Sequence, residues 1–399
     1  MAEFKYLALD SSGNRIKGIH MSESRSEAIL QLRDNGLKII EIDEKKGSMA
    51  NPFEKITIKD LAVFCRQFHT LISAGSTIIN TLDVLRLQTE KKKFKVILNE
   101  VYEDVQKGLV FSDALKKHPD SFHNILISMV RAGEYSGNLD NIMDRMAVYY
   151  EKENQLRNKI SGAMVYPIVL SVMAIGVVTF LMTFIMPTFV ELFTTSGVQL
   201  PLVTRILLGI SNVLKNYWYI VFGVLGGFIF FMAKFLSKGE GARLFDKFKI
   251  NSPIIGSLNN KIITARFSRT LAILLNSGAS LIDSIEIVSN VVGNSIVRDK
   301  LMEARESMKK GVLISASINK INFFTPMVVS MIKIGEESGE LDSILDKTAN
   351  FFDDEVETSL HKLVVMIEPL LIVVMGGLVG FIVIAMLLPL FDIMNTVKS

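Results

Sequence analysis

The residues of this sequence that could do chemistry are concentrated in one stretch, Gly-Glu-x-Ser-Gly-x-Leu-Asp, which occurs twice. Two glycines permit a tight corner after a helix, and the aspartate favours the start of the next helix because it complements the positive end of the helix dipole. The same acidic residues could also contact a partner protein, and the two interpretations can hold together. The candidate residues are Gly133, Glu134, Gly137 and Asp140 in the first copy and Gly335, Glu336, Gly339 and Asp342 in the second.

The rest of the chain lacks a recognisable catalytic set. No Gly-Lys dipeptide occurs, which excludes a Walker A phosphate loop. If the protein's work uses the energy of a nucleotide, another protein must bind that nucleotide. The hydroxyl residues of the first apolar segment, Ser171, Thr179 and Thr183, have no histidine or aspartate in that segment to activate them. The five histidines lack His-Glu-x-x-His spacing, and the single Cys65 is expected to be a small buried residue. We therefore expect that the protein is not an enzyme and that it binds neither a cofactor nor a metal ion.

Composition indicates a membrane protein with large water-exposed parts. The 399 residues are 49% apolar and 21% charged, which is too apolar for a chain fully surrounded by water. The net charge is only +3, so nucleic acid is not an expected partner. The mostly basic run Lys91–Lys95 could contact anionic lipid or an acidic protein, but a solvated loop between helices is the simpler interpretation.

Three charge-free intervals predict helices that cross the bilayer at residues 164–188, 216–236 and 366–391. The first interval has 31 uncharged residues and the third has 23, each enough to cross roughly 30 Å of hydrocarbon at about 1.5 Å per residue. The second has 18 and is the least certain, although it begins with Tyr217-Trp218-Tyr219, aromatic residues typical of the headgroup level. The lipid bilayer is therefore an expected partner.

The distribution of lysine and arginine predicts the orientation of these helices. Basic residues precede the first span and follow the second, whereas the intervening loop has only Arg205 and Lys215. Because cytoplasmic loops are enriched in lysine and arginine, the N-terminus is predicted to be cytoplasmic. Residues 189–215 are then an outside loop and residues 392–399 an outside tail.

An internal repeat organises the chain. Residues 64–75 recur 203 positions later as 267–278, and the stretch that ends at Asp140 recurs 202 positions later with Asp342. The repeat continues into the membrane, where Met164-Val-Tyr-Pro167 matches Met366-Ile-Glu-Pro369. Each repeat is thus a cytoplasmic helical bundle followed by its own spanning helix, and the second span only returns the chain. Gly75 and its counterpart Gly278 are expected to end the first helix of each bundle.

The predicted fold is a mainly α, polytopic membrane protein with a small N-terminal α/β domain and three transmembrane helices. Residues 1–43 show two short strand patterns, a helix that ends at Gly36 and a returning strand. A polar linker at 44–56 leads into helical bundle 1 (57–163, module one below), and helical bundle 2 occupies 237–365 (module two). The helices of module one are predicted near 77–90, 94–107, 111–117 and 122–134.

The matched final helices of the two modules differ in charge. Residues 336–357 hold nine acids and one base, a net of −8, whereas the matched residues 134–155 hold five acids and two bases, a net of −3. A solvated surface explains part of this excess, but a basic partner would relieve the repulsion between like charges. We therefore expect module two to offer an acidic face to a cytoplasmic partner, with the candidate residues Asp353, Asp354, Glu355 and Glu357.

These features together resemble the type II secretion system F family, which includes the inner-membrane platform proteins of type IV pili. The resemblance is carried by the doubled Gly-Glu-x-Ser-Gly-x-Leu-Asp stretch, by Tyr166-Pro167 and Glu368-Pro369 at the starts of two spans, and by the opening that begins at Phe4. It covers essentially the whole chain. The departures are small: Glu337 stands where the first repeat has Tyr135.

The resemblance implies a non-enzymatic platform in the bacterial cytoplasmic (inner) membrane. Its implied partners are a cytosolic hexameric assembly ATPase, pilin or pseudopilin subunits, other inner-membrane assembly proteins and further copies of itself. The competing classes are a membrane transporter and a membrane-bound receptor or sensor without catalytic activity. Substrate uptake into liposomes would identify the transporter, and ligand binding to the outside loops would identify the receptor.

Overall fold

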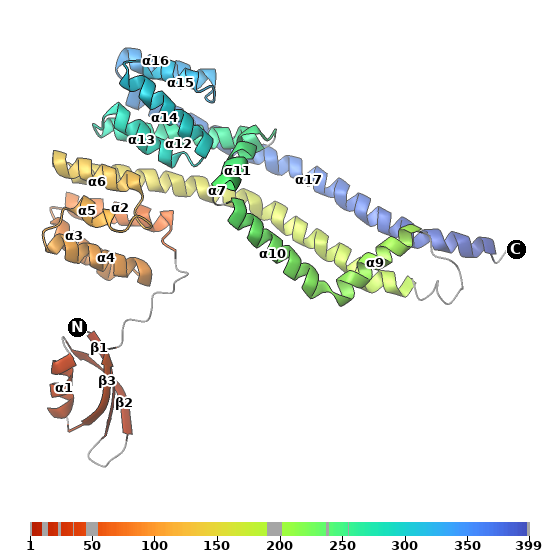
Figure 1. The fold of residues 1–399 in the computed structure, drawn as a ribbon, viewed down its shortest axis with the longest axis horizontal. Coiled ribbons are helices and arrows are strands. Elements are labelled where there is room, and N and C mark those ends of the chain that lie inside the picture. Colours follow the sequence, from red (N-terminus) through yellow and green to blue (C-terminus); the bar gives the residue numbers. More distant parts are fainter. Residues whose placement is uncertain are drawn as a thin grey trace. The chain divides into compact units, whose positions relative to one another are not determined.

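A computed structural model describes residues 2–9, 15–22, 25–34, 36–44, 55–189, 202–236, 239–253 and 255–396. The described chain is mostly helical and forms two compact units, residues 1–123 and 124–399 (Figure 1). Most of the predicted linker, residues 190–201 of the predicted outside loop and the last three residues of the predicted outside tail lie outside the described residues.

The N-terminal part of the first unit contains a three-stranded sheet and one helix. The strands are β1 (Ala2–Leu9), β2 (Arg15–Ser22) and β3 (Lys38–Glu44), in the order β2-β1-β3 with antiparallel pairing. Leu32 of helix α1 (Arg25–Asp34) packs against Tyr6 of the sheet. Tyr6 lies across its β2 partner Gly18, where a Cβ atom would come within 2.5 Å of the tyrosine hydroxyl, so a larger residue there would require the tyrosine side chain to move.

The first unit continues with four helices around an aromatic core. Helix α2 begins at a capping box, in which Thr57 accepts from the backbone N–H of Asp60 and the Asp60 carboxylate accepts from the backbone N–H of Thr57. The rings of Phe68 and Phe111 stack with centroids 5.0 Å apart. These helices are α2 (Ile58–Ser73), α3 (Ile78–Gln88), α4 (Lys92–Gln106) and α5 (Phe111–Lys116).

The second unit contains the end of module one and all of module two. Helix α6 (Asn124–Ser136) turns into α7 (Leu139–Phe180), which continues through a π-helical turn, η1 (Leu181–Ile185), to Phe189. Module two repeats the pattern of module one with α12 (Ile255–Asn276), α13 (Leu281–Val291), α14 (Ser295–Lys309), α15 (Ile314–Lys320), α16 (Pro326–Ser338) and α17 (Leu341–Thr396). Helices α9 (Leu202–Asn216) and α10 (Trp218–Leu236) lie between the two modules in the sequence, and α11 (Gly239–Asn251) is the first helix of module two.

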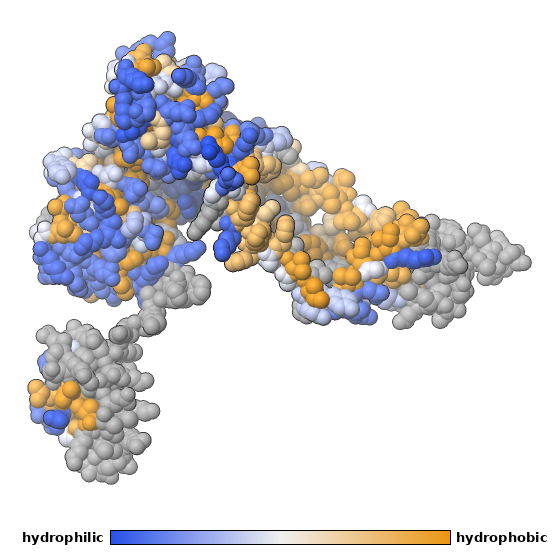
Figure 2. All heavy atoms as spheres, viewed as in Figure 1, coloured by the Kyte–Doolittle hydropathy of each residue, from blue (hydrophilic) through white to orange (hydrophobic). Residues whose placement is uncertain are grey.

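Two of the described helices are long and apolar enough to cross a membrane. They lie within residues 139–189 and 341–387, and each begins with a polar segment that leads without a break into the apolar one. Figure 2 shows hydrophobic surface along α7, α10 and α17 and mostly hydrophilic surface over the short helices of module two. Helix α10 covers the predicted second span in 19 residues, and its assignment as a third span remains a prediction.

Candidate functional site

The repeated Gly-Glu-x-Ser-Gly stretch forms a sharp corner between two helices in both modules. Gly137 and Gly339 have φ angles of +69° and +76°, in the left-handed region that favours glycine. At Gly335 a Cβ atom would lie 2.9 Å from the Cα of Leu341, and at Gly133 it would lie 3.1 Å from the Cα of Leu139. The first glycine therefore lets the next helix pack directly on the one that ends, and the second reverses the chain. Asp140 and Asp342 lie in the first turns of α7 and α17.

Glu336 has a structural task that the sequence did not reveal. Its carboxylate accepts from the backbone N–H groups of Ile314 (2.8 Å) and Ser315 (3.2 Å) and from the Ser315 hydroxyl (2.6 Å). These groups lie at the N-terminus of α15, whose own N-cap residue provides no side-chain bond. The glutamate of the repeated stretch thus caps a neighbouring helix, where the helix dipole favours negative charge. The sequence did hold one signal for this role: both repeats keep this glutamate, whereas the next residue changes from Tyr135 to Glu337.

The helix ends predicted at Gly75 and Gly278 have the same geometry in both repeats. The φ angles of the two glycines are +87° and +83°. After α2, the N–H of Ser76 bonds to the carbonyl of Leu71 at 3.1 Å, and after α12 the N–H of Ala279 bonds to that of Leu274 at 3.0 Å. These are Schellman caps, which satisfy the last carbonyls of a helix. Both glycines therefore end helices.

The acidic run of module two is largely paired within the molecule. Arg269 binds Asp353, and Lys159 of α7 binds Glu357. Lys261 of α12 donates to Glu355 at 2.7 Å, and this hydrogen bond lowers the pKa of the glutamate. The predicted net of −8 counted one segment alone, so it missed the bases that face this segment from neighbouring helices. Asp354, by contrast, is exposed beside a cavity of about 220 Å³.

A buried carboxylate of α7 also joins this helix to α12. Glu153 is buried and accepts two bonds from the forked guanidinium of Arg266, at 2.6 and 3.1 Å, and one from Arg157 at 3.1 Å. Such bidentate pairs fix geometry as well as charge. About one turn further along α7, Leu156 forms a small apolar core with Val356 and Leu360 of α17. The final helices of the two modules are therefore bound to each other and to α12.

The spanning helices also meet at the predicted repeat positions. The Tyr166 hydroxyl donates to the Glu368 carboxylate at 3.2 Å, and these two residues are counterparts in the repeat, 202 positions apart. Pro167 and Pro369 follow them inside α7 and α17. This bond therefore joins α7 and α17 at equivalent positions of the two repeats.

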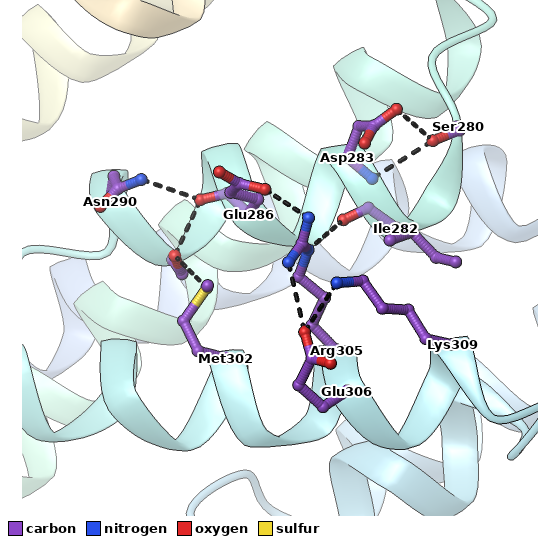
Figure 3. A network of polar contacts seen from close by, with 10 residues as sticks. Ser280, Ile282, Asp283, Glu286, Asn290, Met302, Arg305, Glu306 and Lys309 are labelled. Atoms are coloured by element: carbon purple, nitrogen blue, oxygen red, sulfur yellow. Dashed lines mark hydrogen bonds and ion pairs between the residues drawn. The ribbon is translucent and has the colours of Figure 1, made fainter.

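Other polar groups of module two are used to hold its short helices together. Arg305 of α14 donates to the carbonyl of Ile282 at 3.2 Å and binds Glu286 of α13 at 2.5 Å (Figure 3). Glu306 pairs with Lys309 on the same helix, and that hydrogen bond lowers the pKa of the glutamate. In the first unit, burial raises the pKa of the Cys65 thiol, which opposes formation of a reactive thiolate.

The predicted outside loop contains a helix that packs on the apolar ends of both long helices. In α9 the Thr204 hydroxyl donates to the carbonyl of Ala385 in α17 at 2.7 Å, and the Ser211 hydroxyl donates to the carbonyl of Met182 in the π-helical turn. Leu207 of α9 joins Met182 and Ile382 in a shared apolar core. The segment predicted as an outside loop thus contains a packed helix whose hydroxyl groups bond to neighbouring backbone carbonyls, and its location outside the membrane remains a prediction.

Comparison with known proteins matches both repeats to one family. The model described as Type II secretion system (T2SS), protein F matches residues 64–187 and 267–389, and its N-terminal domain model matches residues 1–43. Type IV pilus assembly protein PilC of Thermus thermophilus is 40% identical, with 100% of both chains covered, and PilC of Myxococcus xanthus is 34% identical, with 100% of this chain and 96% of the relative covered. Type II secretion system protein F of Aeromonas hydrophila is 35% identical over 94% of this chain and 99% of its own.

Proposed function

The chain belongs to the type II secretion system protein F family, and we propose that it is the inner-membrane platform of a type IV pilus or type II secretion machine. In this role it couples a cytosolic hexameric ATPase to the insertion or removal of pilin or pseudopilin subunits at the base of the fibre. Its relatives' names describe assembly and secretion proteins, which favours a structural component over an enzyme. Further copies of the chain and other inner-membrane assembly proteins complete the proposed complex.

The observation that carries this proposal is the continuity of α7 and α17. Each helix begins at a corner in a polar module and runs without a break into an apolar span. The Glu153–Arg266 pair and the Tyr166–Glu368 bond connect these rods along their length. A displacement applied to the polar modules would therefore move the spans as a pair, which is what a mechanical adaptor requires. In the proposed topology the N-terminus and both modules are cytoplasmic, with three spans.

The internal ion pairs of module two change which acids we propose for the ATPase contact. Asp353 and Glu355 are held in internal ion pairs, so neutralising them would disturb the fold as well as any interface. The exposed acids at the start of α17 and in the corner before it are better candidates for contact with a basic partner surface. These candidates are Glu337, Glu340, Asp346 and Asp354.

A charge-neutral variant of these four residues tests the proposal. Substitution with Gln and Asn should weaken binding to the assembly ATPase and flatten the salt dependence of that binding, because screened surface charges steer association. Glu303→Gln on α14 is the control, since this acid is exposed in the same module but lies outside the candidate surface. Co-purification and affinity measured across salt concentrations give the readout. Equal affinity for the four-residue variant, the control and the unchanged protein would show that the acidic face is only a solubilising surface.

A further inference from the structure

Helix α11 presents an unusual outer face in the part of the chain that the structure describes. Leu244 and Phe248, one turn apart, have exposed fractions of 63% and 60%. Arg243 and Lys247 form a second exposed row beside them, and Arg243, which is 69% exposed, also pairs with Asp299 of α14 at 3.4 Å. Glu240 is exposed on the same side in the first turn, where the helix dipole favours an acid. A helix with an apolar row next to a basic row is typical of segments that lie in the interface of a membrane.

The opposite face of α11 is bound to the start of α14 in module two. The Asp246 carboxylate accepts from the backbone N–H of Ser295 at 2.9 Å and from its hydroxyl at 2.8 Å, and so caps the start of α14. The Asp246 carbonyl also accepts from the side-chain amide of Asn294 at 3.1 Å. Lys249 lies over the ring of Phe245 at 4.4 Å. The exposed rows are therefore held in one orientation relative to the module.

The position of α11 along the chain places it at the end of the proposed second span. Helix α10 ends at Leu236 and α11 begins at Gly239. A Cβ atom at Gly241 would lie 2.3 Å from the carbonyl oxygen of Phe235, so the two helices meet in direct contact. Because α11 is only 13 residues long, none of it can lie more than about 20 Å from its start beside the end of α10.

We propose that α11 is a membrane-surface anchor that binds anionic phospholipid headgroups. Leu244 and Phe248 insert between the lipid chains, while Arg243 and Lys247 bind the phosphates beside them. This inference rests on the proposed membrane topology and does not require contact with an ATPase. It gives module two a fixed distance from the bilayer that the spanning helices alone would not set.

Spin labels on the full chain in lipid nanodiscs test this anchor. In a Cys65→Ala background, a single cysteine at position 248 is labelled, and its accessibility to oxygen and to a water-soluble nickel chelate is measured. Position 373 in the apolar part of α17, 71% exposed, is the lipid control, and position 313 in module two, 62% exposed, is the water control. The discs contain phosphatidylcholine alone or with phosphatidylglycerol.

The expected result is a label at position 248 that is more accessible to oxygen than to nickel, with the difference larger in phosphatidylglycerol. Each basic residue near an anionic surface strengthens binding about 5-fold. Arg243→Gln with Lys247→Gln should therefore reduce the extra difference between oxygen and nickel accessibility that phosphatidylglycerol produces at position 248. Arg298→Gln with Lys309→Gln on α14 should leave it unchanged. Nickel accessibility at 248 equal to that at 313 would overturn the proposal, and shielding from both reagents would identify a protein partner instead. If position 373 is also water-accessible, the proposed membrane topology fails as well, which separates the two failures.

Discussion

Glu336 accepts three hydrogen bonds at the start of α15, so replacing its charge should be costly. In Glu336→Gln the amide can accept with only one oxygen and presents an N–H₂ group to backbone donors. We expect a loss of about 1–3 kcal/mol in the free energy of unfolding. Glu337→Gln, next to it and exposed, should change stability by less than about 0.5 kcal/mol. Thermal unfolding of both purified variants in detergent checks this, and equal midpoints would show that the cap contributes nothing.

The corner glycines make a second residue-scale prediction. Gly339→Val forces a β-branched residue into a left-handed backbone conformation, which should cost about 1–3 kcal/mol and reduce protein abundance and fibre assembly. Gly339→Asn should be much milder because asparagine adopts this conformation more readily. Gly335→Ala should also destabilise the protein, since its Cβ would meet backbone rather than a movable side chain. If the valine variant matches the unchanged protein in abundance and assembly, the corner does not need glycine.

Residue pairs far apart in the sequence were the hardest features to predict. Helix ends such as Gly278 and the corner at Gly339 depend on local backbone chemistry, so their positions followed from residue type. The partners of Asp353 and Glu153 come from another helix, and no local pattern identifies Arg269 or Arg266 as the base that faces them. Charge counted along one segment therefore overestimated the free acidic surface of module two.

Helix α9 illustrates the same limit at the scale of an element. Its segment was predicted only as an outside loop, because it lies between two apolar intervals and holds just two basic residues, Arg205 and Lys215. Its hydroxyl groups instead bond to carbonyls of α17 and of the π-helical turn, while Leu202 and Ile206 are exposed on its other side. The two acceptor carbonyls lie 181 and 29 positions away in the sequence, so the hydropathy of α9 alone could not reveal these contacts.

Removing these hydroxyl groups should loosen α9 from the spans. Thr204→Val and Ser211→Ala should each cost about 0.6–1.7 kcal/mol, the range of hydrogen bonds between membrane helices. Thr183→Val is the control, because the hydroxyl of Thr183 bonds to Thr179 within its own helix. Hydrogen exchange of α9 in nanodiscs, measured by mass spectrometry, should rise in the first two variants only. Unchanged exchange in the double variant would mean that apolar contacts alone hold the helix.

At the scale of the whole molecule, the repeat and the long apolar helices were predictable because both rest on patterns that run through dozens of residues. The number of spans and their direction depend on the less certain α10, so they need a direct test. Single cysteines in a Cys65→Ala background should be labelled from outside intact cells at positions 199 and 398, and not at positions 45 or 310. Of these, only Lys310 lies within the described residues. Labelling at 310 would contradict the parallel repeat.

The hydrogen bond between Tyr166 and Glu368 joins a residue to its own copy. Contacts of this kind arise on the two-fold axis of a symmetric dimer, where each residue faces the identical residue of the other subunit. At this point α7 and α17 therefore meet as the equivalent helices of a symmetric pair would. Identical subunits would place two tyrosines or two glutamates at such a position, and two glutamates would repel each other. Because both repeats lie in one chain, the position holds tyrosine on one helix and glutamate on the other, which identical subunits could not place on a shared axis.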